Sequence, residues 1–160
     1  MFEGEQVWGE RSRKFGVKVF ELISFLTDVL KVEKVDAALD ASVTYHDSCA
    51  GLRELGIQGQ PRKLLNTVDG LTLKEMNNAN VCCGFGGTFA VKYSDISNSI
   101  VSEKTENIEK AEADLLLAGD LGCLLNMAGK LRRQGAKTEV RHVAEVLAGM
   151  VDTPPIGGKA

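Results

Sequence analysis

The chain has 160 residues, of which 44% are hydrophobic and 26% are charged. This length is usual for one domain and provides enough apolar side chains for a core, so folding does not require a disulfide. The formal net charge of −3 provides no overall positive field. This argues against a nucleic-acid-binding protein that neutralises phosphates.

The first residues lack the apolar run that a signal peptide requires, and no stretch of about eighteen apolar residues is present to cross a bilayer. We therefore expect a cytoplasmic protein with no membrane span. In that reducing compartment, the four cysteines of the chain are more typical of metal ligands or redox groups than of disulfides.

The first half of the chain predicts one long helix, a strand and a short helix. Residues 8–30 place apolar side chains at spacings of three and four, which is typical of an amphipathic helix. Residues 41–48 (ASVTYHDS) predict a strand that runs directly into Cys49, and residues 61–68 predict a helix with Pro61 in its first turn. We expect the long helix to bury Phe15, Val19, Leu22, Ile23, Leu26 and Val29.

The second half alternates strands and helices. Strands are predicted over 71–76, 113–119 and 137–142, and helices over 94–113, 121–133 and 143–150, with the glycine-rich loop VCCGFGGTF at 81–89. We predict one domain over residues 1–150 and a disordered tail over 151–160. The alternation predicts an α/β fold in which a mainly parallel sheet is flanked by helices.

The four cysteines, Cys49, Cys82, Cys83 and Cys123, should converge at one edge of that sheet. Each follows a predicted strand, and ligands of open parallel sheets bind beyond the carboxyl ends of the strands. Thiolates are soft donors that select iron–sulfur clusters, zinc or cuprous ions. The alternative is that these cysteines are small buried hydrophobic residues without a ligand.

Three glycines, Gly84, Gly86 and Gly87, surround the adjacent cysteines. Glycine allows the backbone to approach a bulky ligand and exposes N–H groups that bond to sulfur, so we predict that these residues help to bind the cofactor. A phosphate-binding loop is the competing interpretation, but the segment lacks the G-x-G-x-x-G spacing.

Two further side chains are candidates beside the thiols. His46 lies three residues before Cys49 and either binds the metal or orients the loop through a hydrogen bond. Lys92 is a candidate for a cation near the thiols. His142 is interpreted as a helix cap, and no Ser/His/Asp pattern or carboxylate pair indicates a catalytic residue.

Four segments carry a family resemblance: TYHDSC (44–49), NVCCGFGGTFAVKYSDIS (80–97), GDLGCLLNMAG (119–129) and VRHVAEVL (140–147). They resemble the second cysteine-rich repeat, the CCG domain, of the lactate-utilisation protein A and glycolate oxidase iron–sulfur subunit family. A more distant similarity is to the cysteine-rich component of heterodisulfide reductase. The resemblance covers roughly residues 8–150 and implies that the chain corresponds to the second repeat of a longer protein.

The resemblance implies an iron–sulfur electron-transfer role in the oxidation of a 2-hydroxy acid, lactate or glycolate. Such a domain would be a component of an oxidoreductase complex with other iron–sulfur subunits, not a self-sufficient enzyme. In the complete family pattern, five cysteines hold a non-cubane [4Fe–4S] cluster. Here Asn126 stands at the position of the fifth cysteine.

Three occupancies therefore fit the sequence. The first is a four-iron cluster on the four cysteines, with Asn126 or a partner atom completing the ligand shell. The second is a zinc site in a structural domain that joins redox subunits, and the third is an empty site. The oligomeric state is left open.

Overall fold

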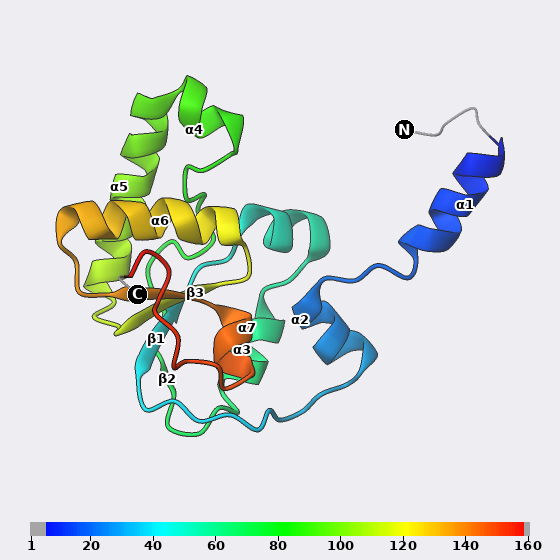
Figure 1. Cartoon of the computed structure of the whole chain (residues 1–160), viewed down its shortest axis with the longest axis horizontal. Coiled ribbons are helices and arrows are strands. Elements are labelled where there is room, and N and C mark those ends of the chain that lie inside the picture. Colours follow the sequence, from blue (N-terminus) through cyan, green and yellow to red (C-terminus); the bar gives the residue numbers. More distant parts are fainter. Residues whose placement is uncertain (1–5, 159–160) are drawn as a thin grey trace. The chain divides into compact units, whose positions relative to one another are not determined.

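The computed structural model describes residues 6–158, which belong to two compact units that divide after Val32. The first unit contains α1 (Gln6–Gly16), α2 (Leu22–Ser24) and the π-helical turn η1 (Phe25–Val29) (Figure 1). The prediction of one continuous helix over 8–30 is therefore wrong. The helix ends at Gly16, a poor helix former, and the β-branched Val17 and Val19 follow it before α2 begins.

The predicted core face of this segment is also largely wrong. Ile23 is buried and Leu26 is half-buried, but Phe15, Val19, Leu22 and Val29 are exposed. Because the helix is interrupted between Gly16 and Leu22, residues on the two sides of the break do not share one continuous helical face.

The second unit carries the predicted alternation of strands and helices. The predicted strands and helices of this part are present, although two are shorter than expected. The elements are β1 (Ser42–Tyr45), η2 (Ala50–Glu54), α3 (Gly59–Leu65), β2 (Thr72–Leu73), α4 (Thr88–Lys92), α5 (Ser94–Lys110), β3 (Leu115–Ala118), α6 (Leu121–Gln134), β4 (Glu139–His142) and α7 (Val143–Leu147).

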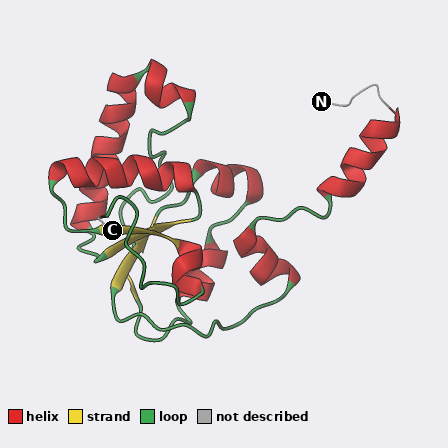
Figure 2. Cartoon of the chain, viewed as in Figure 1, coloured by secondary structure: helices red, strands yellow, loops and turns green. Residues whose placement is uncertain are grey.

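The four strands of this unit form one parallel sheet in the order β2-β1-β3-β4. The sheet lies between helices, which confirms the α/β prediction (Figure 2). From β1 the chain moves outward to β2, then returns past β1 to form β3 on its other side. The strand order thus reverses between β1 and β3, and ligands of open α/β sheets bind at such a point.

The two faces of β3 contact different helices. Leu116 and Ala118 pack against α5 and α6 in one apolar cluster, while Leu115 and Leu117 point to the opposite face. Figure 1 shows α5 and α6 on one side of the sheet and α3 and α7 on the other. The buried members of the cluster are Met76, Cys83, Val101, Ile108, Leu116, Ala118, Cys123, Leu124, Met127, Ala128, Leu131 and Val140.

The residues after α7 return to the sheet. The Ile156 N–H donates to the Val140 carbonyl at 2.8 Å, and Arg132 donates to the Gly157 carbonyl at 3.1 Å. The predictions of a single domain over 1–150 and of a disordered tail stay predictions. Among residues 6–158, no helix combines the length and the apolar character needed to cross a bilayer.

Candidate metal centre

His46 directly follows β1, on the strand that borders the reversal of strand order. Its backbone N–H donates to the Leu117 carbonyl at 2.8 Å, which extends the pairing of β1 with β3 by one residue. The residue is fully buried. The sheet thus holds the backbone of His46 rigidly at the carboxyl edge.

Cys123 reaches the same edge from the first turn of α6. Asp120, two residues after β3, is the N-cap of this helix, and its side chain accepts a hydrogen bond from the Cys123 N–H at 2.9 Å. The structure therefore confirms the prediction that Cys123 lies in the first turn after the third strand. Its thiol is buried against the sheet.

Cys83 is presented by the glycine-rich loop, which requires its glycines for backbone reasons. Gly84 has a φ of +83°, and a Cβ there would lie 2.8 Å from the Ser97 carbonyl oxygen. Gly86 and Gly87 also have positive φ. The loop is anchored by Ser97, whose hydroxyl donates to the Gly84 carbonyl at 2.8 Å. A direct role of these glycines toward a cofactor stays a prediction.

Three ligand atoms from these elements form a compact buried group. One side-chain atom each of His46, Cys83 and Cys123 lies within 4.8 Å of the others. This group does not include Cys49 or Cys82, which are both half-buried. The Cys82 sulfur accepts a hydrogen bond from the Gly84 N–H at 3.3 Å, and Cys49 is the N-cap residue of η2.

The two buried thiols are electrostatically unequal. A hydrogen bond from the Cys123 thiol, together with the neighbouring His46 ring, lowers the pKa of Cys83 to about 5. The same hydrogen bond to Cys83, together with burial, raises the pKa of Cys123. The pair thus favours one thiolate and one thiol, and a bound cation would replace the remaining proton.

The imidazole of His46 has a defined tautomer. Its Nδ1 lies 3.1 Å from the Ala79 carbonyl oxygen, which can only accept, so Nδ1 carries the proton and donates. In the neutral ring, Nε2 then has a free lone pair. This atom is buried and has no hydrogen-bond partner among the described residues.

These donors suit a soft or borderline metal. Two thiol sulfurs and one imidazole nitrogen are ligands of iron–sulfur clusters and of zinc. Ligand atoms around one tetrahedral zinc ion lie about 3.8 Å apart, given a Zn–S bond of about 2.3 Å. The observed limit of 4.8 Å is compatible with that arrangement after a small closure.

Comparison with known proteins identifies the domain that carries this site. Residues 43–128, more than half of the chain, match the model of the cysteine-rich domain named CCG. The chain belongs to the CCG cysteine-rich domain family. The match includes His46 and all four cysteines of the chain, and it confirms the resemblance found in the sequence.

Curated relatives of this CCG domain carry the name Lactate utilization protein A. The chain is 48% identical to those of Geobacillus sp. (strain WCH70) and Geobacillus kaustophilus (strain HTA426), over 92% of this chain and 62% of each relative. It is 44% identical to that of Lysinibacillus sphaericus (strain C3-41), over 92% of this chain and 64% of that protein. The chain thus spans somewhat less than two thirds of the length of these relatives.

A buried lysine of the CCG domain, Lys104, was not predicted. Its Nζ donates to the carbonyls of Asn78 and Ala79, and its residue is 2% exposed. Burial lowers the pKa of Lys104, while the charges of the nearby Cys83 and Asp47 favour the charged form. The predicted cation, Lys92, is instead exposed at the end of α4. The signal in the sequence is the position of Lys104 on the apolar side of α5, which also carries Val101, Thr105 and Ile108.

A second charged group supports the loop that carries Ala79. The side chain of Asp47 is 1% exposed and accepts two hydrogen bonds from Arg62, at 2.7 and 3.1 Å. Arg62 also donates to Glu75 at 2.6 Å. The backbone N–H of Asp47 donates to the Ala79 carbonyl at 3.1 Å. Through Ala79, this ion-paired group of the CCG domain is linked to the imidazole of His46.

Asn126 lies one helical turn after Cys123. Its Nδ2 donates to the Cys83 carbonyl at 2.9 Å, which ties the cysteine loop to α6. The structure therefore brings Asn126 to the site, but as a support for the loop backbone. Its predicted role toward a cofactor stays a prediction.

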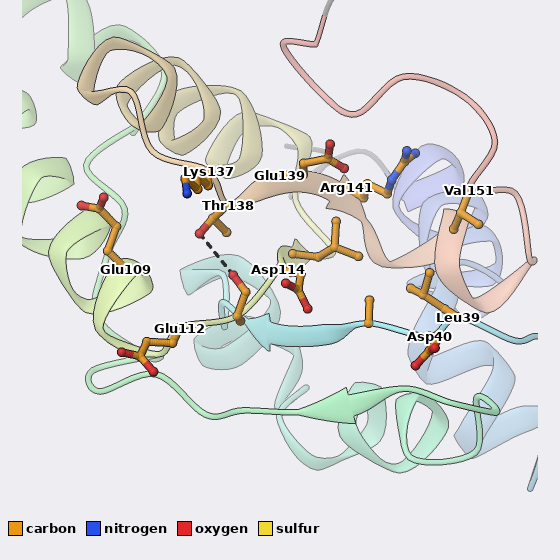
Figure 3. Close-up of a pocket in the computed structure, with 13 residues that line it drawn as sticks. Leu39, Asp40, Glu109, Glu112, Asp114, Lys137, Thr138, Glu139, Arg141 and Val151 are labelled. Atoms are coloured by element: carbon orange, nitrogen blue, oxygen red, sulfur yellow. Dashed lines mark hydrogen bonds between the residues drawn. The ribbon is translucent and has the colours of Figure 1, made fainter.

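A larger cavity, of about 770 Å³, lies at the opposite edge of the sheet, beside the amino ends of the strands (Figure 3). Carboxylates of Asp40, Glu109, Glu112 and Glu139 line it, and it contains none of the cysteines. Near the thiols, a smaller cavity of about 170 Å³ is lined by Cys82, Lys104 and neighbouring residues. We therefore place the chemistry of this CCG domain at the carboxyl edge.

Proposed function

We propose that this domain binds an iron–sulfur cluster through Cys49, Cys82, Cys83 and Cys123 and transfers electrons during the oxidation of a 2-hydroxy acid, lactate or glycolate. The observation that supports this most is the buried group of Cys83, Cys123 and His46 at the reversal of strand order. The names of the relatives favour lactate.

The residues around the thiols suit this role. Cys83 is already disposed to be a thiolate, and Lys104 is a buried cation near it, so part of the negative charge of a thiolate-bound centre is balanced by the protein. When bound, the cluster supplies one-electron redox chemistry. The chain itself holds the ligands, excludes water from Cys83 and Cys123, and offers N–H groups such as that of Gly84 to sulfur.

The domain would act as a component of a larger cytoplasmic oxidoreductase. We propose that further iron–sulfur subunits exchange electrons with it, and that hydride or proton removal from the hydroxy acid occurs outside this domain. The carboxyl edge supports this division, because its buried groups are ligands and their hydrogen-bond partners.

A zinc-stabilised structural domain that joins redox subunits is the second candidate. The specific observation in its favour is that one imidazole and two thiols lie within 4.8 Å of one another, as around a single ion. Under this alternative, the site would stabilise the fold and would show no redox signal.

Metal analysis after anaerobic purification separates the two functions. We expect iron and sulfide in similar amounts, with an electron paramagnetic resonance (EPR) signal upon reduction that is lost in Cys83→Ser and Cys123→Ser. Zinc without iron, even after anaerobic reconstitution with iron and sulfide, would contradict the cluster and favour the structural role. Deletion of the full-length gene should abolish growth on lactate, and normal growth would count against the biological assignment.

A further inference from the structure

We propose that His46 is a ligand of the metal centre through its Nε2 atom, so that the centre is held by mixed nitrogen and sulfur donors. This inference rests on the proposed binding of a metal centre by the domain. It assigns the coordination position that four cysteines leave open to His46, and not to Asn126.

The first argument is the direction of the free lone pair. The Ala79 carbonyl engages Nδ1 of His46 at 3.1 Å, which leaves Nε2 unprotonated in the neutral ring. Metal-binding histidines commonly donate their other ring N–H to a backbone carbonyl in this way, since the bond fixes both tautomer and ring orientation. His46 therefore already has the arrangement of a ligand.

The second argument is the lack of a partner for Nε2. His46 is fully buried, and this nitrogen accepts no hydrogen bond from any described residue. An unsatisfied buried acceptor destabilises a folded protein and calls for an explanation. Because the atom lies within 4.8 Å of the sulfurs of Cys83 and Cys123, a metal bound by those thiolates would satisfy it.

The third argument is the rigidity of the residue. The backbone of His46 is paired with Leu117 of β3, and the next residue, Asp47, is clamped by Arg62. The Ala79 carbonyl that holds the ring also accepts from the Asp47 N–H and from Lys104. The imidazole is thus fixed from several sides before any metal binds, which reduces the conformational cost of coordination.

Asn126 is less suited to the same position. Its Nδ2 donates to the Cys83 carbonyl at 2.9 Å, so its amide group is turned to support the loop backbone. An amide nitrogen also has no lone pair available for a metal. Of the two residues that can complete the ligand shell, His46 is the one with an unused buried lone pair.

Histidine ligation has a measurable consequence for a cluster. A neutral imidazole leaves the centre less negative than a thiolate would, and His ligands raise the potential of Rieske-type centres relative to all-cysteine clusters. The reduced centre should also show magnetic coupling to a directly bound nitrogen.

The chain contains two histidines, which makes the experiment unambiguous. Anaerobically reconstituted protein, labelled with [15N]histidine, should be reduced and studied by pulsed EPR. We expect a strong nitrogen coupling that changes from the 14N to the 15N pattern on labelling, is lost in His46→Gln, and is kept in His142→Asn. His142 is a suitable control because it caps α7 through its side chain, and asparagine is also a favoured N-cap residue.

The outcomes separate this inference from the proposed function. A reduced cluster with iron and sulfide but no strong histidine coupling in the labelled wild-type protein would overturn ligation by His46 and leave the cluster in place. This measurement does not depend on the folding of a variant.

If iron and sulfide do not bind at all, the cluster assignment fails and cobalt(II) titration of the metal-free protein tests His46 independently. We then expect thiolate-to-cobalt absorption bands and at least tenfold weaker binding in His46→Gln than in His142→Asn. Equal affinity of the two variants, with native circular dichroism for both, would overturn the inference.

Discussion

His46 and Ala79 lie 33 residues apart in the sequence and are joined by a hydrogen bond of 3.1 Å between Nδ1 and the carbonyl oxygen. The same carbonyl accepts from the Asp47 N–H and from Lys104 Nζ. One backbone oxygen therefore connects the end of β1, the loop before the cysteine pair, and α5. Changes in any of these donors should be felt at the metal centre.

Replacement of Lys104 by methionine should lower the midpoint potential of the reconstituted centre. A buried positive charge favours the reduced, more negative state, so its removal makes reduction harder. Potentiometric titration followed by EPR measures the shift. Lys92→Met is the matched control, because Lys92 is exposed, and it should leave the potential unchanged. Equal shifts in both variants would show that burial of Lys104 has no special influence.

Replacement of Arg62 by glutamine should destabilise the fold by about 3 kcal/mol, because it leaves the buried carboxylate of Asp47 without its ion-pair partner. Urea denaturation of the metal-free protein measures this change. The double variant Asp47→Asn/Arg62→Gln should recover part of the loss, since no unpaired charge remains. Additive effects of the two single substitutions would contradict the coupling.

Replacement of Gly84 by alanine should impair metal retention and destabilise the protein by more than about 1 kcal/mol, because positive φ and contact with the Ser97 carbonyl both oppose a Cβ. Gly135→Ala is the control. Gly135 also has positive φ, at the end of α6, but a Cβ added there would have no atom within 4 Å. Its variant should lose some thermal stability and keep full metal content, as measured by iron analysis.

Replacement of Asp114 by asparagine should make stability less dependent on pH in the acidic range. Hydrogen bonds from the Ser42 hydroxyl and N–H, at 2.6 and 2.8 Å, lower the pKa of Asp114 in the folded state. Its contribution is therefore present above the pKa of the unfolded chain and is lost as pH falls through the lower folded pKa. Thermal unfolding across this range should show the variant and the wild type converging on acidification; a constant difference would contradict this account.

Local patterns in the sequence were sufficient for most of the second unit. The β-branched run before His46, the apolar run of β3 and the cap at Asp120 each depend on neighbours within a few residues, and the structure places their elements as predicted. The same reasoning failed for residues 8–30. The apolar spacing there continues through the break after Gly16, so periodicity alone did not reveal the end of the helix.

The sequence by itself determined the α/β class, the family and the four cysteines as the chemical groups of interest. Only the tertiary structure decided that His46, Cys83 and Cys123 form the compact buried group, and that Lys104 is the buried cation. The physical reason is that these relationships depend on the pairing of β1 with β3 and on the packing of α5 and α6 against them. Such contacts join residues distant in the sequence, and no local spacing encodes them.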